Sequence, residues 1–371
     1  MRLRQKIEEE IRGCGPIPFS RYMEMCLYDP ELGYYAAHAQ QFGKAGDFYT
    51  SSDVHAVFGR LLARQFDEMW RALDSPAALQ IVELGPGRGL FAQDVLDWAE
   101  KKFPEFFAAV RYMLVEASPA LRARLGETLQ RRIATGKAEI RNELPAQLSA
   151  PVIIFANEFF DALPVEVISH RGELRVGCEQ GRFVELFVQP PAEALEYLDR
   201  YSVHPETGER VEAALAAQQY MRIIAQRLQR GFVIVIDYGY TREEQLAGRH
   251  RGTVTAFRRH TISPGPYEAP GEQDITAHVN FTALQDAGKA GGLEPLALLT
   301  QAQFLMGIGE GNQFADAFEE ARLPQEQAKV ALQLKHLVTP AGMGESFHVL
   351  VMSKGLDPAT ARQLSGLKFA R

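Results

Sequence analysis

A glycine-rich turn at residues 85–89 is the feature of the chain most directly tied to chemistry. A short apolar run ends at Glu83-Leu84, the turn Gly85-Pro86-Gly87-Arg88-Gly89 follows, and an amphipathic segment begins after it. This order predicts a strand, a tight loop and a helix. Glycines let the backbone turn sharply and let a ligand lie against the main chain, while N–H groups at the start of the helix face that ligand. Glu83 would place a carboxylate beside it.

The glycine spacing narrows the kind of ligand. Nicotinamide enzymes usually carry Gly-x-Gly-x-x-Gly, which holds a pyrophosphate, whereas this chain has Gly-x-Gly-x-Gly beginning two residues after an acidic residue. The arrangement suits an adenosyl amino acid without phosphate and resembles the first motif of S-adenosylmethionine (SAM) methyltransferases. We therefore expect Glu83, Gly85, Gly87 and Gly89 to bind SAM. A tight turn between a packed strand and helix is the alternative.

Glu116 ends the next apolar run, Met113-Leu114-Val115. Ligands of open parallel sheets lie at the carboxyl ends of the strands, where a carboxylate can accept both hydroxyl groups of a ribose. We expect Glu116 to bind the ribose of the cofactor. A solvated acid at the end of a strand is the alternative.

A third apolar run, residues 152–156, leads into Asn157-Glu158-Phe159-Phe160-Asp161. We expect Asn157 to contact the cofactor at its methyl end. Glu158 and Asp161 are three residues apart, so they could share one side of a helical turn and together bind and orient a guanidinium cation. We predict that they are the catalytic residues. Acids favoured by a helix dipole are the alternative.

Composition limits the class of protein. The 371 residues carry a net charge of −7, which argues against sequence-blind binding of nucleic acid. The three cysteines, Cys14, Cys26 and Cys178, show neither disulfide nor zinc spacing, so we expect a reducing, cytoplasmic compartment and no metal site. No apolar run approaches the roughly 20 residues of a membrane helix, and the first residues do not resemble a signal peptide.

Short apolar runs alternate with helical patterns from residue 79 onward, which predicts an α/β fold with a doubly wound, mostly parallel sheet. We expect strands at 79–83, 112–116, 152–156, 232–237 and 253–257, helices at 90–103, 119–132 and 212–230, and edge strands at 293–299 and 347–352. The expected parts are an N-terminal helical segment and cofactor lid (1–75), a core (76–299) with a hairpin insertion at about 165–211, a helical cap (300–340), and a closing strand with the C-terminal tail (341–371).

Three blocks resemble one family: Gly46-Asp47-Phe48-Tyr49-Thr50-Ser51, residues 83–89, and residues 157–165, Asn-Glu-Phe-Phe-Asp-Ala-Leu-Pro-Val. The chain resembles the MidA family, which includes a mitochondrial complex I assembly factor that methylates arginine with SAM. The resemblance implies a Rossmann-like class I methyltransferase core with an added cap. It also implies that Gly46, Asp47 and Thr50 bind the cofactor, with Asp47 and Thr50 closing over its amino-acid end. Asn280 stands where the family pattern has Asp, so we leave it out of the catalytic set.

These observations predict a SAM-dependent methyltransferase. The resemblance implies that it modifies an arginine of a protein substrate, in the assembly of a respiratory complex. A homodimer is possible. Two alternatives stay open: a SAM-binding assembly factor or chaperone with little turnover, and a nicotinamide-dependent oxidoreductase. Methylation of a small molecule is a further option. His278 could accept a proton, although a lone histidine is more often structural.

Overall fold

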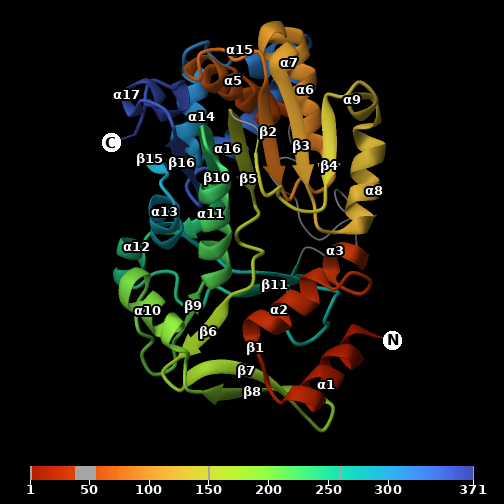
Figure 1. Cartoon of the computed structure of the whole chain (residues 1–371), viewed down its shortest axis with the longest axis vertical. Helices are drawn as coiled ribbons and strands as arrows, with labels where there is room; N and C mark the ends of the chain where they lie inside the picture. The colour runs from red at the N-terminus through yellow and green to blue at the C-terminus, as the bar shows by residue number, and fades with distance from the viewer. Residues whose placement is uncertain (1, 38–55, 149–150, 259–260, 371) are drawn as a thin grey trace.

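The computed structural model describes residues 2–37, 56–148, 151–258 and 261–370. Figure 1 shows an elongated molecule with the large sheet and its helices in the upper half. The first helices and an antiparallel sheet form the lower half. The chain leaves the upper half after β5 (Val152–Asn157) and returns to it in α11 (Leu215–Arg227) and β10 (Gly231–Tyr240), so most of the antiparallel sheet is inserted between two neighbouring strands of the large sheet.

The central sheet is mostly parallel, as the sequence predicts. Its strands run in the order β15-β16-β10-β5-β2-β3-β4, and β14 (Val279–Asn280) pairs with β10. Only β16 runs antiparallel to its neighbours on this path. The strands are β2 (Leu79–Leu84), β3 (Val110–Val115), β4 (Ala138–Arg141), β5 (Val152–Asn157), β10 (Gly231–Tyr240), β15 (Glu294–Thr300) and β16 (Phe347–Lys354).

Both faces of this sheet are covered by helices, because alternate residues of its apolar strands point to opposite sides. Ile81 and Phe155 belong to the apolar cluster on one face, whereas Val82 and Ile154 belong to the cluster on the other. The first face packs against α5 (Ala56–Ala72), α6 (Leu90–Lys102), α7 (Pro104–Ala109), α8 (Pro119–Thr128), α9 (Gln130–Ala134), α14 (Gln301–Glu310), α15 (Ala315–Phe318) and α16 (Pro324–Val338). The second face packs against α11 (Leu215–Arg227) and α13 (Phe281–Ala290).

The lower half is built on a five-stranded antiparallel sheet. It contains the strands of the hairpin insertion predicted at about 165–211, joined by a strand from the N-terminal segment. Its strands are β1 (Ile17–Pro18), β6 (Glu166–Ser169), β7 (Gly172–Glu179), β8 (Arg182–Val188) and β9 (Arg210–Ala213). The helices around it are α1 (Leu3–Cys14), α2 (Phe19–Tyr28), α3 (Tyr34–Ala37), α10 (Ala192–Tyr201) and α12 (Arg242–Leu246).

The structure corrects three expectations. The strand expected at 253–257 is β11 (Thr255–Arg258), which lies outside the central sheet and pairs with β12 (Thr261–Ile262) and β13 (Asp274–Thr276). The short strand β4 was not expected, and the helix expected at 119–132 is divided into α8 and α9. Isolated four-residue patterns carry too little information to place a strand in a particular sheet.

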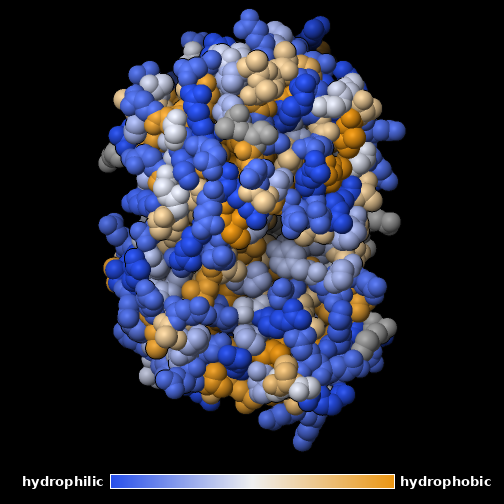
Figure 2. All heavy atoms as spheres, in the orientation of Figure 1, coloured by the Kyte–Doolittle hydropathy of each residue, from blue (hydrophilic) through white to orange (hydrophobic). Residues whose placement is uncertain are grey.

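The predicted cap segment, 300–340, forms helices α14, α15 and α16, which pack with α5 against the sheet. The division of the chain at residues 75, 299 and 340 stays a prediction. After β16 the described chain ends with α17 (Pro358–Ala361) and a 3-10 turn (Ser365–Leu367). No helix among the described residues is long and apolar enough to cross a membrane. Figure 2 shows mainly hydrophilic residues on one face of the molecule, with hydrophobic residues in small groups.

A substitution of Phe155 tests the packing of the apolar core on the first face of the central sheet. The buried ring of Phe155 stacks on Phe91 at 4.5 Å between centroids and meets Phe66 edge-on at 5.7 Å. Replacing Phe155 by Ala leaves a cavity and should lower the free energy of unfolding by about 3–5 kcal/mol, measured by urea denaturation. The control Leu246→Ala, at a residue 58% exposed on α12, should change it by less than about 0.5 kcal/mol. Equal effects of the two substitutions would contradict this assignment of the core.

Candidate active site

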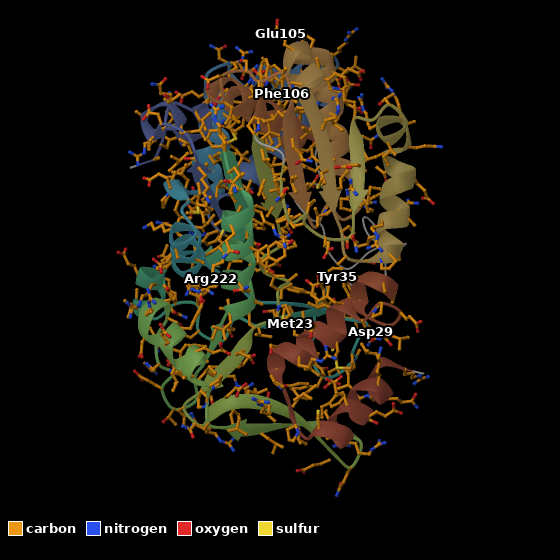
Figure 3. The ribbon with its side chains drawn as sticks, viewed as in Figure 1. Met23, Asp29, Tyr35, Glu105, Phe106 and Arg222 are labelled. Carbon is orange, nitrogen blue, oxygen red and sulfur yellow. The ribbon has the colours of Figure 1, made fainter. Side chains whose placement is uncertain are left out.

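A cavity of about 430 Å³ lies at the carboxyl ends of the central strands. From β2 the chain proceeds to β3 and β4 on one side, and then to β5 on the other side of β2. The strand order therefore reverses between β2 and β5, which is where open α/β sheets bind ligands. Tyr28, Tyr35 and Asp274 of the lower half also line the cavity. Figure 3 shows Tyr35 at the level where the two halves meet.

The glycine turn forms one wall of this cavity. Gly85 and Gly87 line it with φ angles of +62° and +53°, a region that side chains with a Cβ rarely adopt. A Cβ on Gly87 would meet no atom of the described residues within 4 Å, so they leave the space beside this glycine open to a ligand. Gly89, with φ +77°, has a different role: a Cβ there would lie 2.7 Å from the Leu125 side chain, and Gly89 is not among the residues that line the cavity.

Glu83 and Glu116 both reach the cavity and are both buried. Tyr112 donates a hydrogen bond of 2.8 Å from its hydroxyl to Glu83, and burial raises the pKa of Glu83 to about 8. The backbone N–H of Ser118 donates to Oε1 of Glu116 at 2.8 Å, and burial raises the pKa of Glu116 to about 7. Glu116 therefore lies at the end of β3 with a carboxyl group whose charge changes near neutral pH.

The loop after β5 is held by one buried carboxylate. Asp237, on β10, accepts hydrogen bonds at Oδ2 from the backbone N–H groups of Phe159, Phe160 and Asp161, at 3.0–3.2 Å. Its Oδ1 accepts the N–H of Tyr238 at 3.0 Å. Burial raises the pKa of Asp237 well above its usual range, and the charges of Asp161 and Glu158 raise it further. These bonds shape the loop that carries both predicted catalytic acids.

The expected helical turn at Glu158 and Asp161 is wrong. Glu158 has a left-handed backbone, with φ +50°, and residues 158–163 form bends and a turn. The N–H groups of residues 159–161 bond to Asp237 in place of the hydrogen bonds that a helix would make. Glu158 and Asp161 both line the cavity nevertheless.

The two acids have different local partners. Asn157 lines the cavity and donates from its amide to Oε1 of Glu158 at 3.1 Å. Asp161 accepts a hydrogen bond of 2.6 Å from the Tyr238 hydroxyl at Oδ2, while Oδ1 is buried without a hydrogen-bond partner among the described residues. Burial raises the pKa of Asp161 to about 6.

Sequence reasoning missed several residues of the cavity. Asn142 and Glu143 follow β4, and Tyr220, Ile223 and Arg227 come from α11. Recognition of β4 would have pointed to Asn142 and Glu143, because they occupy the position after β4 that Glu116 occupies after β3. Tyr28, Tyr35 and Asp274 are far from the glycine turn in the sequence, and nothing in their spacing places them beside the sheet.

The remaining expectations have mixed outcomes. Gly46, Asp47 and Thr50 lie outside the described residues. Asn280 caps α13, accepting the Ala283 N–H at 3.1 Å and donating to the Tyr201 carbonyl at 2.8 Å, which is a structural role. His278 lies 3.1 Å from His250, nitrogen to nitrogen, and lines a second cavity. The assignment of individual site residues to the cofactor stays a prediction.

Known proteins with the same architecture identify the class. A model of a family of S-adenosyl-L-methionine-dependent methyltransferases matches residues 61–299. A protein from Burkholderia thailandensis, solved with bound S-adenosyl-homocysteine, superposes with a TM-score of 0.83 and 31% identity over 99% of this chain and 95% of that one.

Two curated relatives are named protein arginine methyltransferase NDUFAF7, mitochondrial, or its homolog. The Drosophila melanogaster protein is 29% identical, with 95% of this chain and 85% of that protein covered. The Homo sapiens protein is 28% identical, with 92% and 81% covered.

The fold and its cavity are those of a Rossmann-like methyltransferase. The chain belongs to this family of SAM-dependent methyltransferases, and its cofactor is SAM. The open space at Gly87 and the carboxylate at the end of β3 fit an adenosyl ligand that approaches the main chain.

Gly87→Val tests the glycine turn. The branched side chain would occupy the ligand's space and strain a backbone with positive φ, so S-adenosyl-homocysteine binding should be lost in calorimetry. Gly136→Val is a matched control, because Gly136 also has positive φ (+69°) and open surroundings but lies outside the cavity. It should lose comparable stability and keep its affinity. Retained affinity in Gly87→Val would remove the turn from the cofactor site.

The raised pKa of Glu116 leads us to expect that cofactor binding depends on pH. Ribose hydroxyls donate to the ionised carboxylate, and burial raises the pKa of Glu116 to about 7. Affinity for S-adenosyl-homocysteine should therefore rise between pH 6 and pH 8. Glu116→Gln should weaken binding at pH 8 by about tenfold or more. It should also reduce the slope of affinity against pH to the part that Glu83 contributes, whose pKa is about 8.

Calorimetric titrations at pH 6, 7 and 8 provide the comparison. Glu139→Gln serves as the control, since Glu139 lies on β4 outside the cavity. A wild-type slope that persists unchanged in Glu116→Gln would show that Glu116 does not bind the ribose.

Proposed function

We propose that this methyltransferase transfers its methyl group to an arginine of a protein substrate, as a member of the MidA family acting in assembly of a respiratory complex. The observation that carries the proposal is the pair of cavity-lining acids after β5, Glu158 and Asp161. The names of the curated relatives, which are protein arginine methyltransferases, support it.

The electrostatics of the cavity favour a cationic acceptor. Glu83, Glu116, Glu143, Glu158, Asp161 and Asp274 line it, whereas Arg88 and Arg227 are the basic residues of the described lining. Carboxylates that face a guanidinium bind it through charge-assisted hydrogen bonds. The fixed planar geometry of arginine makes such pairing directional.

The cofactor, when bound, supplies an electrophilic methyl group. Glu158 and Asp161 would orient the guanidinium so that one nitrogen lies in line with that methyl group. As the nitrogen lone pair forms the new N–C bond and the C–S bond breaks, one guanidinium proton must leave. Asp161 is the candidate acceptor, because its pKa is raised to about 6 and one of its oxygens has no other hydrogen-bond partner in the described structure.

Further parts of the proposal concern context. The three cysteines are free, which supports a reducing, cytoplasmic location. The acidic net charge supports a protein rather than a nucleic acid as the substrate. The proposal holds for a monomer and for a homodimer alike.

The second candidate function is a SAM-binding assembly factor without turnover. The raised pKa values of Glu83 and Glu116 bear on cofactor binding alone and fit this candidate equally. Tritium-labelled SAM, added with the protein to a lysate lacking it, separates the two. The proposed function requires label on arginine nitrogens of a protein, identified by mass spectrometry. Label on lysine, a carboxylate or a small molecule would overturn it, and cofactor binding without any label would favour the assembly factor.

Glu158→Gln tests the catalytic pair. It keeps the size of the side chain and removes the charge, so methyl transfer should fall by about 10²-fold or more while affinity for S-adenosyl-homocysteine changes little. Glu105→Gln is the matched control, because Glu105 is exposed on α7, at the far end of the molecule in Figure 3. Turnover of Glu158→Gln at the rate of this control would exclude a catalytic role for the Glu158 charge.

A further inference from the structure

Two carboxylates from distant parts of the chain line the cavity together. Asp161 belongs to the loop after β5, and Asp274 begins β13 of the small three-stranded sheet. Asp161 is 4% exposed and Asp274 is 7% exposed, so both acids are buried. The N–H of Ala277 donates to the Asp161 carbonyl at 2.9 Å, which ties the end of β13 to the loop. The accessory sheet thus brings a second acid to the site.

Two buried tyrosines stand beside these acids. Tyr28 donates from its hydroxyl to the carbonyl of Ala162 at 3.0 Å, and Tyr35 donates to Oδ1 of Asp274 at 3.4 Å. Their ring centroids are 5.4 Å apart. Burial raises the pKa of both tyrosines, and the charges of Asp161 and Asp274 raise it further. The charges of both acids therefore act on each tyrosine hydroxyl.

Asp161 offers a hydrogen-bond acceptor to a cationic ligand. Its Oδ1 atom is buried without a hydrogen-bond partner among the described residues. Burial raises the pKa of Asp161, and among the described residues the groups that lower it are the Tyr238 hydroxyl and backbone N–H groups, which carry no positive charge. A buried carboxylate without full pairing is costly, so a ligand that donates hydrogen bonds and carries positive charge would stabilise it.

We propose that Asp161 and Asp274 bind the acceptor guanidinium between them, against the rings of Tyr28 and Tyr35. This inference rests on the proposed function and adds Asp274 and the two tyrosines to its acceptor site. A guanidinium has five N–H donors in a plane and stacks on aromatic rings, so it can engage two carboxylates at once. The compact ammonium of lysine lacks that planar fork. The site therefore selects arginine over lysine.

The selection can be measured without the natural substrate. N-acetyl-arginine amide and N-acetyl-lysine amide are titrated by NMR into protein saturated with S-adenosyl-homocysteine. The wild type should bind the arginine probe at least tenfold more tightly than the lysine probe. Asp274→Asn should lose most of this preference while its affinity for S-adenosyl-homocysteine stays within twofold. Glu272→Gln is the matched control, because Glu272 is exposed, pairs with Arg258 and lies two residues away; it should behave as wild type.

Tyr35→Phe provides a second test that does not alter a buried charge. It removes the hydroxyl that contacts Asp274 and should reduce the arginine preference about threefold. An unchanged preference in Asp274→Asn would overturn the inference, as would a wild type without preference. If Asp274→Asn does not fold, an unchanged preference in Tyr35→Phe overturns it.

Label transfer separates this inference from the proposed function. Methylarginine formed by Asp274→Asn at the wild-type rate would overturn the role of Asp274 and leave the proposed function intact. Label that the wild type places only on other groups would overturn the proposed function and, with it, the acceptor assignment.

Discussion

The site depends on the buried carboxylate of Asp237. It accepts four backbone N–H groups, three of them from the consecutive residues 159–161. The arrangement satisfies donors that would otherwise be buried without partners, and it forces the chain out of the helical path after Glu158. Because Asp237 belongs to β10, the neighbour of β5, the loop is fixed to the rigid centre of the sheet. The predicted catalytic acids are therefore positioned by a residue that is not itself among those lining the cavity.

Burial of acids is the second constraint. Glu83, Glu116 and Asp161 all have a raised pKa, in each case mainly because burial disfavours the charged form. A cation that binds beside these acids favours their charged forms and offsets the cost of their burial. SAM carries a sulfonium cation, and an arginine side chain carries a second cation. The same arrangement of carboxylates thus suits both the cofactor and the proposed acceptor.

The insertion between β5 and β10 supports the wall of the cavity that lies opposite the central sheet. It carries the hairpins of the lower half, on which α1 and α2 pack through a shared apolar cluster. Tyr28 at the end of α2 and Tyr35 in α3 then lie against the cavity. Ser118, at the start of α8, donates to the Tyr35 carbonyl at 3.2 Å, and Tyr28 contacts Ala162 at 3.0 Å. The tyrosine pair therefore connects the loop after β3 with the loop after β5.

Local sequence determined the parts of the protein that depend on local physics. Apolar runs of five to seven residues predicted β2, β3, β5, β10, β15 and β16, and the glycine turn predicted the strand-to-helix connection that faces the cavity. Glu116 could be placed because the end of a parallel strand is a defined position at the edge of the sheet. Tertiary structure decided the rest. The four residues of β4 are partly polar and gave no strand signal, and β11 pairs in a separate sheet. The hydrogen bonds to Asp237 hold Glu158 and Asp161 in a loop, although their spacing is that of a helix. Tyr35 and Asp274 meet although 239 positions separate them, because such a contact follows from the packing of the whole chain and leaves no local pattern in the sequence.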